Sequence, residues 1–475
     1  MKPGKALTVL GCALVAACGG GAAGTVAGID GGGALPPVAT TITSQGPVTG
    51  FGSIIVNGVR FSTASAAFNI DGASGSESDL AVGQVVIVQG TLNSDGVTGV
   101  ANTVIFDDVV EGPVQSIDVG ANSMVVLGQT VLVNADTTYE VDISPQSLDG
   151  LSVGNIVEVS GYRNSNDEIV ATRIELEGAG SEFEVTGLAT NVDTGAMSFE
   201  IGGLVIDYGA AAVNDFPNGM PEEDQLIEAK GSALGGAGEL LATEIEFRGN
   251  DFDIDDFDEI EIEGLITRFA SAADFDVNGV PVTTNGSTVY ENGSSMDLAL
   301  DRRIEVEGSL SGGVLVADEI EFEIEGSIRI GGLVEAVSGS QVTLLGITVS
   351  VDAGAEFEDE SPADLQTFSL SDVSVGNYLE VRAFDDGGTI VATRVERAED
   401  PGDAFLRGLA DNVSDPNFTI LGITVRTDGG TSFEDDSETS IDASTFFAQA
   451  QDQVVEATGQ FVGGEILADE VELED

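Results

Sequence analysis

The sequence contains no histidine, no tryptophan and only 16 lysine and arginine residues, against 82 aspartate and glutamate residues in a chain of 475. Without histidine there is no imidazole general base, no Ser-His-Asp triad and no histidine ligand for zinc or haem. The formal net charge of −66 argues against nucleic acid as a partner, because nucleic-acid binding depends on cationic contacts to phosphate. Glycosidases need paired carboxylates within a surface that is usually aromatic. The 22 phenylalanines and 5 tyrosines stand mostly at core-compatible positions and give that chemistry no support.

The N-terminus carries the pattern of an export signal. Lys2 and Lys5 precede an apolar run, residues 6–17, that is too short to cross a bilayer as a helix. The run ends in Leu14-Val15-Ala16-Ala17 and is followed by Cys18, which resembles the bacterial lipoprotein signal. This resemblance implies cleavage before Cys18, lipid attachment at Cys18 and, with glycine as the next residue, export to the outer membrane. An ordinary signal peptide cut at a nearby small residue is the alternative.

A lipid on Cys18 would make the membrane a partner and place the protein in the cell envelope, on the periplasmic side or at the cell surface. The following residues, up to position 45, are rich in glycine, alanine, threonine and proline and lack the periodicity that buries a face. They are therefore predicted to form a flexible tether.

The rest of the chain is repetitive. One string, Ile169–Leu176 in its clearest copy, recurs with its alanine at positions 101, 171, 242, 317, 392 and 468, spaced by 70 to 76 residues. A second string, Val153–Gly161, precedes each copy, and a third, Val126–Val131, lies further upstream. Three strings in one order predict six tandem units. The expected segments are a signal peptide at 1–17, the lipidated cysteine and tether at 18–45, unit 1 at 46–108, unit 2 at 109–180, unit 3 at 181–249, unit 4 with an acidic junction at 250–325, unit 5 at 326–400 and unit 6 at 401–475.

Within each unit the pattern predicts three strands, a short helix and two more strands. In unit 2, two alternating runs meet at Gly128, and Ser144-Pro145 offers an N-cap and a first helical residue. Ser361-Pro362 repeats that signature in unit 5, and residues 444–450 look helical in unit 6. The order of elements resembles an OB-fold. We therefore expect an all-β fold, a tandem array of six small OB-like five-stranded barrels, each with at most one short helix. β-Sandwich modules or one β-solenoid are the alternatives.

The units also resemble a known family, the bacterial domain of unknown function 5666, which is found in several copies in secreted lipoproteins. The resemblance rests on first strands that follow a glycine, on the Val153–Gly161 string and on the Ile169–Leu176 string that ends the unit. The resemblance covers residues 46–475 and is clearest in units 1, 2 and 5. In units 3, 4 and 6 aspartate replaces Gly154, at positions 224, 301 and 452. The family implies no activity and no catalytic residues, so we expect a protein that is not an enzyme.

Five units carry glutamate at one equivalent strand position, at residues 158, 228, 305, 380 and 456. Because the residues two further along are also polar, we interpret these glutamates as a solvated strand face and not as active-site acids. Arg173 and Arg394 stand where cross-strand ion pairs with Glu158 and Glu380 can form. Glutamate replaces the arginine in units 3, 4 and 6, so the sequence predicts no fixed ion pair.

The acidic junction of unit 4 holds the candidate metal ligands. Asp251, Asp253 and Asp255 alternate as at the start of an EF-hand loop. However, Asp256 stands where the glycine turn belongs, and Ile262 stands where the bidentate glutamate belongs. Ca²⁺ is therefore the one cofactor to which the sequence points, and an acidic solvated linker is the alternative.

Taken together, these features favour a lipid-anchored, extracytoplasmic binding or spacer protein built from many modules. The high charge predicts a monomer. Its ligand would be an envelope or extracellular protein or polymer. A calcium-dependent adhesive or cation-binding envelope protein is the alternative, and a carboxylate-based hydrolase has the least support.

Overall fold

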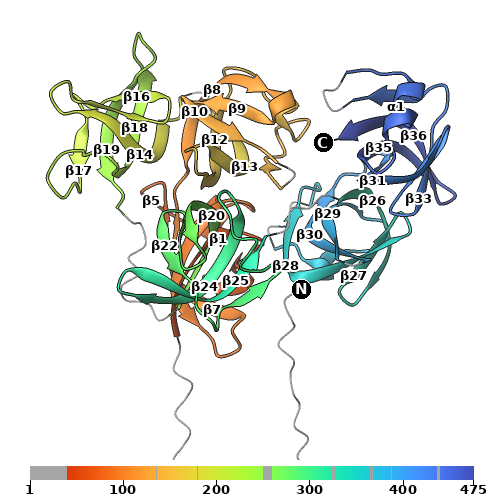
Figure 1. Ribbon diagram of the computed structural model, residues 1–475, viewed down its shortest axis with the longest axis horizontal. Helices are drawn as coiled ribbons and strands as arrows, with labels where there is room; N and C mark the ends of the chain where they lie inside the picture. The colour runs from red at the N-terminus through yellow and green to blue at the C-terminus, as the bar shows by residue number, and fades with distance from the viewer. Residues whose placement is uncertain are drawn as a thin grey trace, which may run out of the picture.

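The computed structural model describes residues 40–134, 136–178, 180–249, 259–323, 328–363, 365, 367–386, 388–435 and 439–474. These residues form 36 strands, four 3₁₀ turns and one α-helix, α1 (Ala443–Gln449). The fold is all-β, and its strands follow one another along the chain as the predicted units (Figure 1). Within the described ranges, no helix has the length and apolar character needed to cross a membrane.

The strands have the following bounds. Unit 1 contains β1 (Thr40–Pro47), β2 (Ile54–Val56), β3 (Val59–Ser62), β4 (Ala67–Ile70), β5 (Ala73–Gly75), β6 (Val85–Leu92) and β7 (Thr98–Phe106). Unit 2 contains β8 (Val110–Asp118), β9 (Ser123–Val126), β10 (Gln129–Leu132), β11 (Thr138–Tyr139), β12 (Ile156–Arg163) and β13 (Ile169–Glu177). Unit 3 contains β14 (Phe183–Asp193), β15 (Ser198–Ile201), β16 (Leu204–Asp207), β17 (Ala212–Asn214), β18 (Leu226–Leu234) and β19 (Leu240–Phe247).

The second half of the chain repeats this series. Unit 4 contains β20 (Glu259–Ser271), β21 (Asp274–Val277), β22 (Val280–Thr283), β23 (Val289–Glu291), β24 (Arg303–Ser311) and β25 (Val314–Phe322). Unit 5 contains β26 (Ile328–Ser338), β27 (Gln341–Leu344), β28 (Ile347–Asp359), β29 (Tyr378–Asp386) and β30 (Thr389–Ala398). Unit 6 contains β31 (Ala404–Ser414), β32 (Asn417–Ile420), β33 (Ile423–Arg426), β34 (Ser432–Glu434), β35 (Val454–Val462) and β36 (Glu465–Glu474), with α1 before β35.

Unit 2 illustrates the topology of a unit. Strands β8, β9 and β10 form an antiparallel meander, and β10 then lies parallel to the last strand, β13. Strand β12 pairs antiparallel with both β13 and β8, which closes a five-stranded barrel of the OB type. Units 3 to 6 repeat this ring of pairings. In unit 1 a single β-bridge between Gly50 and Ile55 closes the ring of pairings.

The recurring strings mark positions where the barrel restricts the choice of residue. Strand β12 has a bulge at Gly161, where a Cβ atom would lie 2.3 Å from the carbonyl oxygen of Val170. Glycine therefore stands at this position in five units, and unit 5 has Ala383. Gly154 has a φ of 94°, in the left-handed region. The aspartates that replace it also have positive φ, 62° at Asp224 and 64° at Asp301, a conformation that aspartate tolerates.

The tether predicted for residues 18–45 is wrong at its C-terminal end. Strand β1 begins at Thr40 and pairs on both sides, with β6 and with β20. Ile42 and Thr43 are fully buried there. These residues form a strand because they pair with two neighbouring strands, although their composition alone is typical of a linker.

The helices predicted at Ser144-Pro145 and Ser361-Pro362 are not found among the described residues of these segments. Each segment leads instead to a single 3₁₀ turn, Leu148–Gly150 in unit 2 and Leu370–Asp372 in unit 5. In unit 2 the chain folds back on itself so tightly that a Cβ atom on Gly150 would lie 2.1 Å from the carbonyl oxygen of Pro145. The helix predicted over 444–450 in unit 6 is confirmed as α1.

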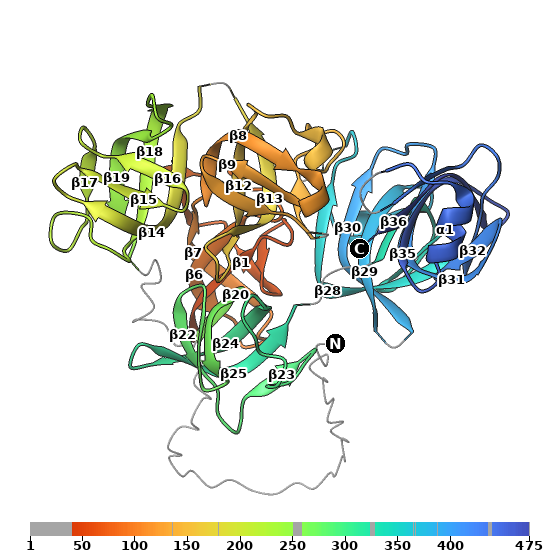
Figure 2. The ribbon, with the colours of Figure 1, turned by 45° about the horizontal axis from the view of Figure 1, so that its top comes forward.

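The units associate in pairs through their first strands (Figures 1 and 2). Strand β8 of unit 2 pairs antiparallel with β14 of unit 3, and β26 of unit 5 pairs antiparallel with β31 of unit 6. Strand β1 of unit 1 pairs parallel with β20 of unit 4, although these units are far apart in the sequence. Each pair of barrels is therefore one continuous hydrogen-bonded sheet, of 13, 12 or 11 strands.

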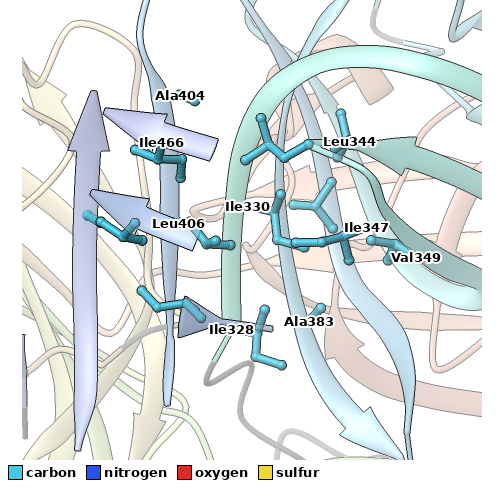
Figure 3. Packing of buried hydrophobic residues seen from close by; sticks show 14 of the residues in the cluster. Ile328, Ile330, Leu344, Ile347, Val349, Ala383, Ala404, Leu406 and Ile466 are labelled. Carbon is cyan, nitrogen blue, oxygen red and sulfur yellow. The ribbon is translucent and has the colours of Figure 1, made fainter. Parts of the chain in front are cut away.

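The pairing of units 5 and 6 also unites their hydrophobic cores. Ile330 on β26 and Leu406 on β31 are register partners, and both are buried (Figure 3). Units 2 and 3 likewise share one cluster of buried apolar side chains. The apolar alternation of β8, β14, β26 and β31 therefore serves two barrels at once, whereas the buried apolar side chains of units 1 and 4 form two separate clusters.

Shortening Ile330 to valine tests the shared core. Ile330→Val is expected to lower the free energy of unfolding by about 1 kcal/mol, because the lost methyl group leaves a small cavity between two barrels. Leu409→Val on β31 is the control, since Leu409 is 62% exposed. We expect that control to stay within about 0.5 kcal/mol of wild type in calorimetry. Equal effects of the two substitutions would contradict the shared core.

Candidate functional site

The few basic side chains of this acidic chain gather where units meet. Arg173 of unit 2 is 5% exposed, and its Nη1 donates to the carbonyl oxygen of Val82 in unit 1 at 2.9 Å. The same Nη1 lies 3.4 Å from Oε1 of Glu358 in unit 5. Lys230 of unit 3 donates to the carbonyl oxygen of Asp71 in unit 1 at 3.2 Å. Basic side chains therefore cross-link barrels that β-pairing does not join.

A cavity of about 800 Å³ lies where units 1, 2, 4 and 5 meet. Its polar lining includes Thr49, Asn57, Asp136, Tyr162, Thr172, Glu263, Arg302, Arg303, Glu305, Glu356, Arg382, Thr393 and Arg394. Two unit contacts border the cavity. Arg303 of unit 4 lies over the ring of Tyr162 in unit 2, 5.7 Å from its centroid, and is held by Glu263. Ser165 of unit 2 donates through its backbone N–H to Oδ1 of Asp301 in unit 4 at 2.7 Å.

Two arginines of unit 5 face each other across neighbouring strands of the cavity wall. Arg382 on β29 and Arg394 on β30 are register partners. Arg394 is 3% exposed and is held by Glu356, Glu358 and Glu396. These three carboxylates raise the pKa of Arg394 although burial opposes its charge. Its positive charge is therefore fully compensated.

Arg382 has no such compensation. Its Nη2 donates to the backbone carbonyl of Thr137 in unit 2 at 3.1 Å, and no ion pair joins it to a carboxylate within the described residues. Burial, followed by repulsion from Arg394 and Arg329, lowers the pKa of Arg382 to about 10. The side chain is thus a half-buried cation without a counter-ion, a common property of binding sites for anions.

Several lining residues, Arg382 and Arg394 included, carry buried polar atoms without a hydrogen-bond partner among the described residues. These atoms are the hydroxyls of Tyr162, Thr172 and Thr393, Nη1 of Arg382 and Nε of Arg394. All of them can donate a hydrogen bond. The residues that carry these atoms line the wall formed by units 2 and 5, and the atoms themselves are buried.

Two of the glutamates predicted to form a solvated strand face are instead engaged by other side chains. Glu228 is 1% exposed and binds Lys230 and Arg248, each at 2.6 Å. Glu158 is half-buried and accepts from Nε2 of Gln84 in unit 1 at 3.1 Å. The solvated-face interpretation fails because the sequence pattern of one strand cannot show which barrel covers it.

The cross-strand pairs that the sequence allows for Arg173 and Arg394, without predicting them as fixed, do not form in the structure. Arg173 binds Glu175 and Glu358 and does not pair with Glu158. Arg394 likewise binds neighbours other than Glu380, which lies 3.8 Å from Arg329. Register explains the change, because Glu158 and Glu175 stand opposite each other while Arg173 faces Ser160.

The pH dependence of stability provides a test of the contact between units 2 and 5. Burial, together with the charges of Glu396 and Glu358, raises the pKa of Glu360 to about 8, while Gln146 and Arg394 lower it in part. The folded state therefore keeps a proton that the unfolded state releases above its ordinary pKa near 4.5. This contribution to stability is complete below pH 4.5 and is lost as the pH rises through 8.

We accordingly expect the calorimetric unfolding temperature of the wild type to fall between pH 6 and pH 9. Glu360→Gln, which keeps the shape and carries no charge, is expected to make that fall smaller by several degrees. A wild type and a variant with the same pH profile would contradict the assignment.

The residues singled out from the sequence as a lipid site and as metal ligands, Cys18, Asp251, Asp253 and Asp255, lie outside the described residues. The sequence patterns did not single out Arg382, Tyr162 or Thr172 as candidate site residues. One signal was available, because Arg382 is a cation at a strand position where units 2 and 6 carry Ser160 and Thr458. Residues of four units line the cavity, so the sequence pattern of a single unit does not predict it.

The fold and the site define a protein made of repeated OB-like barrels that meet around a polar cavity. The family described as a domain of unknown function (DUF5666) matches the chain five times, at residues 41–104, 111–175, 263–321, 331–396 and 407–472. These segments cover more than half of the sequence, and the chain belongs to this family. Unit 3 lies outside the matched segments but has the same ring of strands. No curated protein matches the chain.

Proposed function

We propose that this chain is a binding protein of the cell envelope, anchored through a lipid on Cys18, that takes up a small organic anion in the central cavity. Arg382 is the observation that carries the proposal. Its guanidinium is partly buried beside the cavity without a carboxylate partner among the described residues, and its Nη1 is unused. Carboxylate and phosphate groups match a guanidinium through two parallel hydrogen bonds.

The arrangement of units supports binding in preference to spacing. Four units contribute to the cavity wall, so the site exists only when the array is assembled. A spacer gains nothing from β-pairing between unit 1 and unit 4, because this pairing shortens the array. A carboxylate-based hydrolase has less support, since Glu358 and Glu396 are engaged by Arg394.

Native mass spectrometry of the protein extracted from its own envelope tests the ligand. We expect wild-type protein to retain a small anion and Arg382→Gln to lose it. Arg268→Gln is the matched control, because Arg268 is an exposed arginine that already binds Asp274 and Asp276. Retention of the same molecule by Arg382→Gln, or no small anion on the wild type, would contradict the proposed site.

The anchor is tested separately. The mass of the N-terminal peptide is expected to contain acyl groups on Cys18, and Cys18→Ala is expected to leave the membrane fraction. An unmodified Cys18 would remove the anchor from the proposal and leave the cavity unaffected.

A further inference from the structure

A second cluster of buried charge lies where units 1, 2 and 3 meet, and none of its residues lines the central cavity. Asp71 stands in the turn between β4 and β5, Asp108 between β7 and β8, and Glu184 on β14. One carboxylate oxygen from each of the three lies within 4.8 Å of the other two. Oδ1 of Asp71 accepts from the backbone N–H of Asp108 at 3.2 Å, which fixes these two residues relative to each other.

Asp108 is the member of this cluster that most needs a partner. Its side chain is 3% exposed, and its Oδ1 has no hydrogen-bond partner among the described residues. A carboxylate oxygen in this position is costly unless positive charge reaches it directly.

The surrounding cations do not supply enough charge. Lys230 and Arg248 both bind Glu228 at 2.6 Å, and Lys230 also binds Oε2 of Glu184 at 2.6 Å. Arg248 also binds Oδ1 of Asp107 at 2.7 Å. Lys230 and Arg248 therefore face more carboxylates than they can neutralise.

We propose that Asp71, Asp108 and Glu184 bind one Ca²⁺ ion, which ties unit 1 to unit 3. Oxygen ligands alone suit a hard cation, and calcium accepts an irregular set of them at about 2.3–2.6 Å. Ligands on opposite sides of Ca²⁺ are then up to about 5 Å apart, so three oxygens that lie within 4.8 Å of one another can reach one ion.

A second trio of carboxylates provides the contrast. Oxygens of Glu358, Glu360 and Glu396 also lie within 4.8 Å of one another. However, Arg394 donates to Glu358 and Glu396, and Nε2 of Gln146 donates to both oxygens of Glu360. Because arginine and glutamine already serve these oxygens, this trio is expected to bind no calcium.

Calorimetric titration of the EDTA-treated full chain with CaCl₂ in 150 mM NaCl tests the site. We expect one tight binding event in the wild type, at least tenfold weaker binding in Asp108→Asn, and unchanged binding in the control Glu360→Gln. Equal affinity in Asp108→Asn, or a wild type with no tight site, would overturn the proposal. The second result is what a proton held on Glu184 in place of a metal predicts.

An experiment on wild-type protein alone guards against a variant that fails to fold. Crystals grown with Tb³⁺ as a calcium substitute are expected to give an anomalous scattering peak within about 2.6 Å of the three carboxylates. A peak only at other acidic groups, or no peak, would overturn the site.

Discussion

Replacing Lys230 with methionine is expected to lower the free energy of unfolding by about 3 kcal/mol. Lys230 is the only lysine among the described residues. Its Nζ lies 2.6 Å from carboxylate oxygens of Glu184 and Glu228, which are 4% and 1% exposed. Removing the ammonium leaves two buried carboxylates with one cation fewer, and breaking such a pair is costly. Calorimetry in EDTA gives the measurement, because no metal ion can then replace the lost charge.

Arg268→Met is the control for Lys230→Met. Arg268 also binds two carboxylates, Asp274 and Asp276, but its side chain is 48% exposed. Exposed pairs contribute little, so we expect the unfolding midpoint of this variant to stay close to that of wild type. Similar losses in the two variants would show that burial is not what makes Lys230 important.

Arg394→Met is expected to cost about 4 kcal/mol. Arg394 is 3% exposed and is bound by three carboxylates, and methionine fills part of its volume without satisfying any of them. The loss of stability is expected to appear in calorimetry at pH 8 and to shrink at pH 5. At the lower pH the stranded carboxylates can take up protons.

The double variant Arg394→Met with Glu396→Gln separates lost charge from lost packing. Glu396→Gln removes one of the carboxylates that Arg394→Met leaves without a cation, and it is expected to restore part of the stability. The effects of the two neighbouring substitutions are then coupled and not additive. Additive losses in the double variant would contradict the assignment of an ion-pair network around Arg394.

The six units were predictable because the barrel imposes its requirements on each copy separately. Gly161 recurs because a side chain there would meet the backbone of the neighbouring strand, and Gly154 or an aspartate recurs because φ is positive. Buried side chains such as Val157 and Val159 give the strand alternation. These are local constraints, and a single sequence records them.

The association of the units was not predictable in the same way. The pairing of Ile42 on β1 with Glu259 on β20 joins residues that are 217 positions apart, and no spacing or motif in the sequence predicts this pairing. The same holds for the cavity, whose Arg382 and Tyr162 belong to different units. The pattern of one barrel shows which face is polar, and the packing of a second barrel decides whether that face meets water.

The candidate calcium ligands illustrate this limit. Alternation along the sequence drew attention to Asp251, Asp253 and Asp255, because consecutive residues are the only neighbours that a sequence displays. In the structure Asp71 and Asp108 of unit 1 come together with Glu184 of unit 3. Asp108 stands in a short acidic link between units, a type of segment that is usually solvated.

A disulfide between units 2 and 4 tests the packing of barrels around the cavity most directly. Oγ of Ser165 lies 2.9 Å from Oδ2 of Asp301, 136 positions further along the chain. In the double variant Ser165→Cys with Asp301→Cys, we predict an intramolecular disulfide on mild oxidation, seen as faster migration of the unreduced monomer and absent from either single variant. A double variant that stays reduced, or that forms only intermolecular dimers, would contradict the assembled arrangement.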